Sequence, residues 1–146
     1  STIPSNGSEN WEMSGTKALL DSNAIIYATK RIIDAERLLS EHDSYFVSII
    51  SFIEVYGYGF PNAAEKAIAD EIFKNLEIVN LDNSIAQQSI IYRKNPTKKI
   101  KLPDAVILAT ARILHADLVT NNQADFEKVD PSVNLISIDA YKDESD

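Results

Sequence analysis

The sequence contains no cysteine, and this absence removes several chemistries at once. Disulfide bonds, zinc sites with thiolate ligands and cysteine nucleophiles are all excluded. No run of about 18 apolar residues is present either, so the sequence predicts no transmembrane helix and no membrane partner. A charged segment followed by an apolar segment is missing at the start, so we expect no secretory signal and a cytoplasmic protein.

Phosphate-binding glycine motifs are also missing. Without a Walker-type loop or a GxGxxG motif, the sequence does not support a site for nucleoside triphosphates or dinucleotides. The two histidines, His42 and His115, show no spacing typical of metal ligands. We therefore expect both histidines at the surface or at helix ends, without a catalytic role.

Basic residues are outnumbered, with 14 Lys and Arg against 22 Asp and Glu, which gives a net charge of −8. This total argues against a protein that coats duplex nucleic acid, because such a protein needs a basic face. One nine-residue stretch nevertheless carries five positive charges that no acidic residue interrupts: Arg93, Lys94, Lys98, Lys99 and Lys101. Taken alone, this stretch is most simply a solvated loop.

The length of 146 residues and the apolar content of 45% suit one globular domain with a sizeable core. Residues 1–16 are rich in Ser, Asn, Gly and Thr without periodicity, which predicts a flexible lead-in. Met13 is either the natural start of the protein or an ordinary residue of this segment, and both interpretations stay open. We expect the domain over residues 17–139 and an acidic tail over residues 140–146.

Short apolar runs alternate with longer amphipathic runs along the domain. The apolar runs predict strands over residues 17–21, 45–48, 77–81, 117–120 and 134–138. The runs between them predict helices over residues 22–30, 34–42, 49–58, from 61 onward, 82–92 and 103–114. Because strands that alternate with helices imply right-handed crossovers, we expect an α/β fold. It should be a single three-layer α/β/α domain with a central, mostly parallel five-stranded sheet.

Acidic residues follow the predicted strands, near the sheet edge where α/β proteins bind ligands. They are Asp21 after the first strand, Glu54 after the second, Asp104 at the start of an apolar helix and Asp125 after the fourth strand. Helix capping is an equally simple role for Asp21, and the helix dipole favours Asp104. Glu54 is harder to dismiss, because its helix is almost wholly apolar and is therefore predicted to be buried.

Several carboxylates at one rim of a sheet would repel one another, and a divalent cation would relieve that repulsion. Ligands that are all oxygen atoms point to a hard cation, Mg²⁺ or Mn²⁺. Such ions activate water and stabilise charge on a phosphoryl group. The acidic residues therefore predict phosphodiester hydrolysis.

Four segments, taken in order, resemble the motifs of PIN-domain ribonucleases. LLDSNAIIY is similar to the opening strand of that family with its Asp-Ser/Thr-Asn signature, and SIISFIEVYGY is similar to the second motif, whose helix carries the Glu. LPDAVILATA and LVTNNQADF resemble the third and fourth motifs. The resemblance spans residues 17–139 and implies a PIN-like fold of five parallel strands flanked by helices.

The resemblance also implies a Mg²⁺- or Mn²⁺-dependent endoribonuclease. It assigns catalytic and metal-binding roles to four acidic residues: Asp21, Glu54, Asp104 and Asp125. Four polar residues are expected to position these ligands, namely Ser22, Asn23, Thr120 and Asn122, although a turn asparagine is the simpler interpretation of Asn122. Because the basic stretch leads directly into Asp104, it becomes a candidate contact for the phosphates of RNA.

The compact length resembles the VapC-type toxins of toxin–antitoxin pairs. This resemblance implies an RNA substrate, an antitoxin protein as partner and a homodimer. Two alternatives stay open: a non-toxin nuclease or metal-dependent phosphatase, and a catalytically silent PIN module that binds RNA or protein. An Asp-nucleophile phosphatase usually has a second Asp two residues after the first, where this chain has Asn23, and a silent module would be expected to have lost acidic residues.

Overall fold

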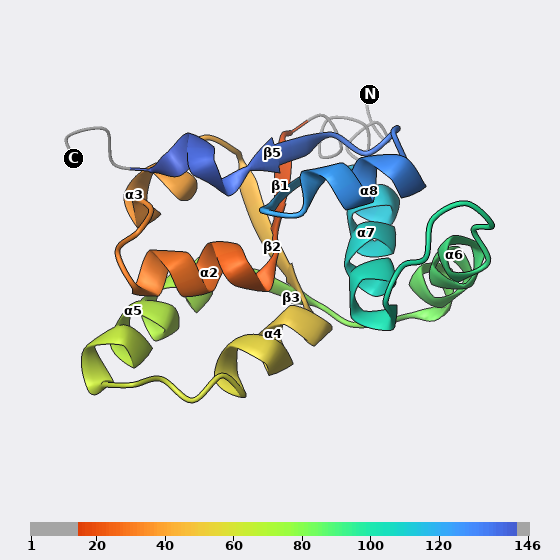
Figure 1. The fold of residues 1–146 in the computed structure, drawn as a ribbon. Helices are drawn as coiled ribbons and strands as arrows, with labels where there is room; N and C mark the ends of the chain where they lie inside the picture. Colours follow the sequence, from red (N-terminus) through yellow and green to blue (C-terminus); the bar gives the residue numbers. More distant parts are fainter. Residues whose placement is uncertain (1–14, 143–146) are drawn as a thin grey trace, which may run out of the picture.

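A computed structural model of the chain describes residues 15–142, so Met13 and most of the predicted lead-in lie outside the described residues. One sheet has the strand order β3-β2-β1-β4-β5, and every neighbouring pair is parallel (Figure 1). The strands are β1 (Lys17–Leu20), β2 (Ser44–Ser48), β3 (Glu77–Val79), β4 (Asp117–Thr120) and β5 (Leu135–Ser137). The predicted five-stranded sheet is confirmed.

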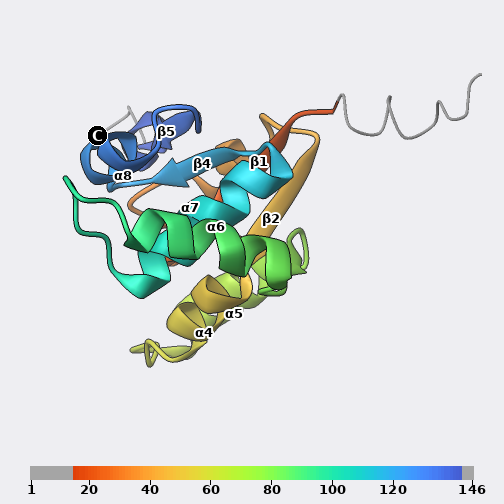
Figure 2. The same cartoon turned by 90° about the vertical axis from the view of Figure 1, so that its right-hand side faces the viewer.

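Helices cover both faces of this sheet. One face carries α2 (Ser22–Thr29), α3 (Ala35–Leu38), α4 (Ile49–Tyr56), α5 (Ala63–Phe73) and the 3-10 helix η1 (Ile138–Tyr141). The other face carries α6 (Asn83–Arg93), α7 (Leu102–Leu114) and α8 (Gln123–Val129), with α6 and α7 side by side (Figure 2). None of these helices, within the described part of the chain, is long and apolar enough to cross a membrane.

Two hydrophobic clusters hold the layers together. Side chains of β1 alternate between them, because Ala18 and Leu20 join the first cluster and Leu19 joins the second. On the second face, α7 buries every residue over the range 105–111, since it lies between the sheet and α6. The apolar character of the LPDAVILATA segment is therefore explained by burial of this helix from several sides.

Three helices differ from the sequence prediction. The predicted helix over residues 34–42 is wrong beyond Leu38, because the backbone N–H groups of Glu41 and His42 donate to the Tyr45 hydroxyl and the chain turns there. Helix α5 begins after Asn62, whose side chain caps it, and not at Pro61. Helix α8 was not predicted, because two asparagines precede this short segment and favour a turn.

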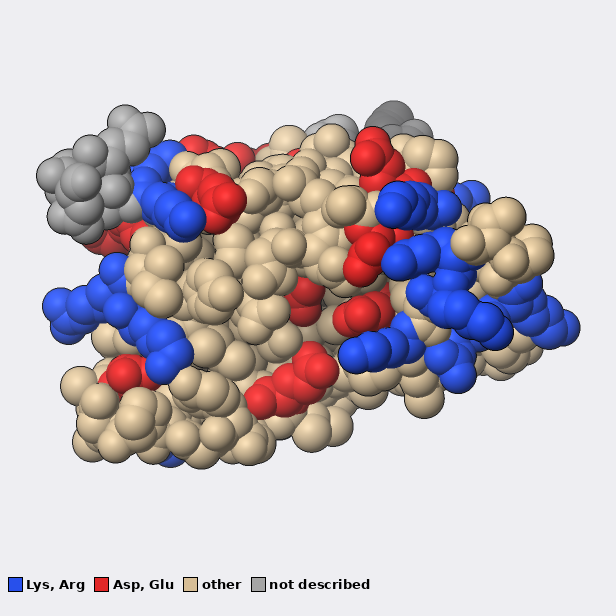
Figure 3. All heavy atoms as spheres, viewed as in Figure 1, with Lys and Arg blue, Asp and Glu red and all other residues tan. Residues whose placement is uncertain are grey.

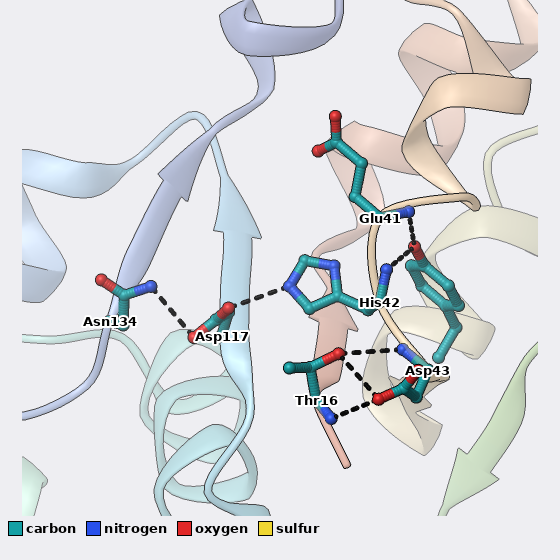
Figure 4. A network of polar contacts seen from close by, with 7 residues as sticks. Thr16, Glu41, His42, Asp43, Asp117 and Asn134 are labelled. Carbon is teal, nitrogen blue, oxygen red and sulfur yellow. Dashed lines mark hydrogen bonds and ion pairs between the residues drawn. The ribbon is translucent and has the colours of Figure 1, made fainter.

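A polar network closes the sheet at the amino ends of its strands (Figure 4). His42 Nε2 lies 2.9 Å from Asp117 Oδ2 at the start of β4, and Asn134 donates to the other oxygen of Asp117. Beside this pair, Thr16 and Asp43 bind each other through three hydrogen bonds that involve a side chain and one between their backbones. The expectation that His42 is a surface residue is wrong, since its side chain is only 7% exposed.

His115 and the first residues of the predicted acidic tail also have defined structure within the described part of the chain. His115 caps α7 in a left-handed conformation and is exposed, as expected for a helix-end residue. Tyr141, placed by the sequence in the acidic tail, is 1% exposed, and Lys142 forms an antiparallel bridge with Ile33. The buried part of the chain therefore continues past residue 139.

Candidate functional site

Asp21 lies at the carboxyl end of β1, between β2 and β4, where the strand order changes direction and α/β sheets bind their ligands. The residue is only 7% exposed. Ser22 donates its backbone N–H to Asp21 Oδ1 at 2.7 Å, and the Thr120 hydroxyl donates to Oδ2 at 2.8 Å. Burial raises the pKa of Asp21, although both hydrogen bonds act in the opposite direction.

Asp21 also serves as the N-cap of α2, through the same bond to Ser22. Capping uses only Oδ1, while Oδ2 is directed to Thr120 at the end of β4. The backbone N–H of Asp21 itself donates to the Val119 carbonyl at 3.0 Å. The carboxylate is therefore fixed from both neighbouring elements, which a residue that only capped a helix would not require.

Glu54 lies on α4, and the prediction that this helix is buried is wrong. Only Ser51 and Val55 of α4 are buried, whereas Ile53 is 61% exposed and Glu54 is exposed as well. The helix packs against the body of the protein through one side, so its apolar residues do not all reach the core. Partial burial raises the pKa of Glu54, the Ser22 side chain lowers it, and the charges of Asp21 and Asp104 raise it further.

Asp104 occupies the first turn of α7 and is half-buried. Burial and the charge of Asp21 raise its pKa, Lys101 lowers it, and Asp125 raises it. The structure therefore brings the three acids close enough for the charge of Asp21 to raise the pKa of Glu54 and of Asp104, and for Asp104 to raise that of Glu54.

Asp125 is in a different electrostatic setting in the first turn of α8. Its Oδ1 lies 2.8 Å from the ammonium nitrogen of Lys98. This ion pair lowers the pKa of Asp125, in contrast to the raised pKa of the other three acids. The four predicted acids are therefore one cluster of three carboxylates and one lysine-paired carboxylate.

The donor set of this cluster fits a divalent cation, because carboxylate oxygens are the preferred ligands of Mg²⁺ and Mn²⁺ and their mutual repulsion favours a bound cation. In residues 15–142, no three His, Asp or Glu side chains already stand as the ligands of one ion. Direct coordination by Asp21, Glu54 and Asp104 together would thus require their side chains to move closer. The cluster therefore fits a divalent cation by the type of its ligand atoms and by its negative charge.

The polar residues beside the acids have clear partners. Asn23 donates its side-chain amide to Asn121 Oδ1 at 3.2 Å, which ties α2 to the loop after β4. The Thr120 hydroxyl, which donates to Asp21, also accepts the backbone N–H of Asn122. Sequence reasoning missed Asn121, because two consecutive asparagines after a strand are typical of a turn and carry no other signal.

The basic stretch lies beside the acidic cluster. Figure 3 shows acidic side chains near the middle of one face and a dense group of Lys and Arg side chains next to them. Lys98 forms an ion pair with Asp125, and the charge of Lys101 lowers the pKa of Asp104. Arg93 instead donates to the Ile100 carbonyl at 2.7 Å, and Lys94 and Lys99 are exposed.

Comparisons with known proteins agree with this arrangement. A family model described as the PIN domain matches residues 18–131. A search of curated proteins found no match. The matching residues include the four acids and most of the fold, so the match covers the candidate site as well as the sheet.

Solved structures with the same fold include toxin–antitoxin complexes. A toxin–antitoxin complex from Klebsiella pneumoniae matches with a TM-score of 0.65 and 27% identity, covering 83% of this chain and 97% of that chain. VapBC2 from Rickettsia felis, bound to a promoter DNA fragment, matches with a TM-score of 0.70 and 22% identity over 84% and 98% of the two chains. DNA-bound VapBC from Salmonella typhimurium matches with a TM-score of 0.71 and 21% identity over 84% and 98%.

The family match, the parallel sheet and the acids that follow its strands lead to one conclusion. The chain belongs to the PIN domain family of nucleases.

Proposed function

We propose that the protein is a metal-dependent endoribonuclease that hydrolyses RNA phosphodiester bonds in the cytoplasm. The observation that carries the proposal is the cluster of Asp21, Glu54 and Asp104 beside a basic loop, in which the charge of Asp21 raises the pKa of the two other acids. Such a cluster suits a divalent cation, and the loop suits the phosphates of a nucleic acid.

Asp21 and Asp104 would hold a Mg²⁺ or Mn²⁺ ion, with Glu54 as a further ligand. A bound ion would supply positive charge to a phosphoryl oxygen and lower the pKa of a nearby water molecule. Thr120 and the backbone of Ser22 keep the Asp21 carboxylate in one orientation. Glu54, with its raised pKa, is suited to accept a proton from the attacking water.

The direct test is the conservative removal of one charge from the cluster. Asp21→Asn and Asp104→Asn should each abolish Mg²⁺- or Mn²⁺-dependent cleavage of RNA while circular dichroism shows an intact fold. Glu71→Gln on α5, where the glutamate is exposed and paired with Lys74, is the matched control and should cleave as the wild type does. Full activity in both Asp variants would refute the site.

The substrate class is tested in the same assay. RNA should be cut internally, whereas single-stranded DNA and a phosphomonoester should be cut slowly or not at all. Rapid release of phosphate from the monoester would favour a phosphatase, and binding of RNA without cleavage would favour a silent module.

We further propose that the protein is the toxin of a toxin–antitoxin pair. The support is that solved structures with this fold include such complexes, among them the one from Klebsiella pneumoniae at 27% identity. The product of a small adjacent reading frame should co-purify with this chain and inhibit RNA cleavage. If that product neither binds nor inhibits, the toxin–antitoxin assignment is refuted and the nuclease assignment is not affected.

We also propose a homodimer formed through the α6 surface, which consists of Leu81, Ile90, Ile91 and Leu102. These apolar residues are 44%, 45%, 62% and 58% exposed, and three of them line a groove of about 430 Å³. Asp82 precedes α6, and Arg93 and Lys94 end it. Two antiparallel copies of α6 would therefore place opposite charges at both ends of an apolar contact.

A further inference from the structure

The helix that begins at Asp21 ends in exposed basic residues on the same face of the protein. Asp21 is the N-cap of α2, which has eight residues and is therefore about 12 Å long. Lys30 and Arg31 follow its last residue, and both are exposed. Figure 3 shows basic side chains over this end of α2, with the acidic side chains between them and the basic loop. Positive charge therefore lies on both sides of the acidic cluster.

Arg31 adopts a left-handed backbone conformation, with a φ of 61°. Its backbone N–H donates to the Ala28 carbonyl at 3.1 Å, and the N–H of Ile32 donates to the Tyr27 carbonyl at 3.0 Å. These two bonds form a Schellman motif, in which glycine is the usual residue because it has no Cβ. Backbone groups make both bonds, so the turn does not require an arginine side chain, and that side chain strains the fold.

The surroundings of Arg31 do not explain this strain. Within residues 15–142, its guanidinium group forms no ion pair, and the next acid along the chain, Asp34, is the cap of α3. The helix dipole favours a cation at this end of α2, and Lys30 already supplies one. His115 has a similar φ, but it ends α7 on the side away from the acids. The position of Arg31 beside the site thus points to a ligand outside the chain.

An aromatic ring lies next to these two basic residues. Lys30 Nζ is 5.2 Å from the centroid of the Tyr58 ring and 3.6 Å from Glu65 Oε1, and Tyr58 is 39% exposed. We call Lys30, Arg31 and Tyr58 the α2-end patch. Proteins bind single-stranded nucleic acids through exposed aromatic rings, on which bases stack, beside cations that contact phosphates. The patch therefore suits single-stranded RNA better than an acidic peptide, which has no bases.

The outer face of α2 connects the patch to the acidic cluster. None of the eight residues of α2 is charged. Its half-buried residues Asn23 and Tyr27 lie on the same side of the helix as Lys30, because they are spaced four and three residues apart. A polyanion that follows this face away from the acids meets no acidic side chain of α2 before it reaches the patch. The length of the helix corresponds to a few nucleotides.

We infer that bound RNA runs from the basic loop, over the acidic cluster and along the outer face of α2, to a second contact at the α2-end patch. In this contact Arg31 binds a phosphate and Tyr58 stacks on a base. The inference rests on the proposed RNA-cleaving function and adds the path of the substrate on the protein.

The first test measures RNA binding without cleavage, by fluorescence anisotropy of labelled single-stranded RNA in EDTA. Arg31→Gln should lower the affinity about fivefold at low salt and reduce the slope of log affinity against log salt by about 0.7, the values for one lost phosphate contact. Arg31→Lys keeps the charge and should retain the wild-type slope. Lys74→Gln removes one charge from an exposed lysine of α5 and should bind as the wild type does.

Arg31→Gly separates binding from stability. This variant removes the side chain and relieves the left-handed strain, so it should bind RNA as weakly as Arg31→Gln while its Tm is at least that of the wild type. Differential scanning calorimetry measures the Tm.

Tyr58→Leu separates stacking from charge. It should weaken RNA binding and leave the salt slope unchanged, because no phosphate contact is lost. In cleavage assays with Mn²⁺, Arg31→Gln should raise KM and leave kcat unchanged, because Arg31 lies a helix length away from the acids.

Wild-type affinity, salt slope and KM in Arg31→Gln would overturn the inference, and the nuclease assignment would stand as long as RNA is still cut. An equal loss of affinity in Lys74→Gln, or a lower Tm in Arg31→Gly, would overturn it as well. Unchanged RNA binding with weaker binding of the proposed antitoxin would assign the patch to a protein partner instead. A wild type that neither binds nor cuts RNA would refute the proposed function, and the inference with it.

Discussion

Asp104 provides a test of the metal site that does not depend on cleavage of RNA. Burial and the charge of Asp21 raise its pKa, so the ionised carboxylate that is present at neutral pH destabilises the fold. A bound cation removes this cost. At an Mn²⁺ concentration about 100-fold above the dissociation constant, the gain is about 2.7 kcal/mol, which corresponds to a rise of about 5 to 10 °C in Tm for a domain of this size.

Asp104→Asn should therefore be at least as stable as the wild type in EDTA and should lose most of the Mn²⁺-induced rise in Tm. Differential scanning calorimetry with EDTA and with Mn²⁺ measures both quantities. Glu71→Gln should retain the full rise. An equal rise in Asp104→Asn and the wild type would mean that Mn²⁺ binds elsewhere.

The residues of the site were predictable to different degrees. Asp21 and Asp104 are placed where the sequence predicted them, because a strand end and a helix start are local features. The burial of Glu54 was predicted wrongly, because composition alone does not tell which side of α4 meets the protein. The Lys98–Asp125 and His42–Asp117 pairs join segments distant in sequence, so only the fold reveals them.

At the scale of elements, the side chain of Asp130 joins three helices. Tyr92 of α6 and Arg112 of α7 both donate to Asp130 Oδ2, and Ser132 donates twice to Oδ1. Asp130 itself follows the last residue of α8 and is 6% exposed. Burial alone would raise its pKa, but the hydrogen bonds outweigh burial and lower the pKa to about 2.

Since the folded-state pKa of Asp130 lies below its ordinary value, its ionised form stabilises the fold above about pH 4, and the contribution is lost as the pH falls toward 2. The size of this contribution is about 2 kcal/mol. Asp130→Asn should reduce the free energy of unfolding by about 2 kcal/mol at neutral pH, with the difference from wild type shrinking in acid.

Urea denaturation over a pH series measures this effect. Asp139→Asn changes an exposed aspartate whose side chain is 68% exposed, and it should leave the free energy of unfolding nearly unchanged. A constant difference between Asp130→Asn and the wild type at every pH would show that the charge of Asp130 is not the cause.

The basic loop gives a second prediction at this scale. Lys99 is exposed beside the acidic cluster, and we expect it to contact a phosphate of bound RNA. Lys99→Glu should weaken binding to single-stranded RNA and reduce the slope of log affinity against log salt by about 0.7, the value for one lost phosphate contact. Fluorescence anisotropy at several salt concentrations measures the slope.

Lys74→Glu is the matched control for this reversal of charge. Lys74 ends α5 just before β3 begins, so it lies toward the opposite edge of the sheet, and its side chain is 71% exposed. The slope of log affinity against log salt for Lys74→Glu should match that of the wild type. Equal slopes in all three proteins would remove Lys99 from the path of the RNA.

A helix or strand was predictable when the residues that determine it lie within the element itself. All five strands were located, because each stands out as a short apolar run, although only β1, β2 and β4 are largely buried and β3 at one edge is mostly exposed. The end of α3 was not predicted correctly, since it depends on the Tyr45 hydroxyl. This hydroxyl accepts two backbone N–H groups of the preceding turn. Helix α8 was missed, although Phe126 within it is fully buried.

For the molecule as a whole, the α6 surface predicts the oligomeric state. Ile90→Glu would place a charge in the centre of the proposed apolar contact, and it should convert the dimer to a monomer. Sedimentation velocity at several protein concentrations measures this change. Ile32→Glu alters an isoleucine of similar exposure, 43%, outside the α6 surface and should leave the dimer intact. A monomeric wild type would refute the dimer.

The hydrogen bond between Thr120 and Asp21 joins residues 99 positions apart in the chain. On a translating ribosome, Asp21 emerges before the strand that orients its carboxylate has been synthesised. The nascent chain cannot form this hydrogen bond until Thr120 has left the exit tunnel and β4 has joined β1. The order of strands in the sheet thus delays assembly of the Asp21 site until β4 has been synthesised.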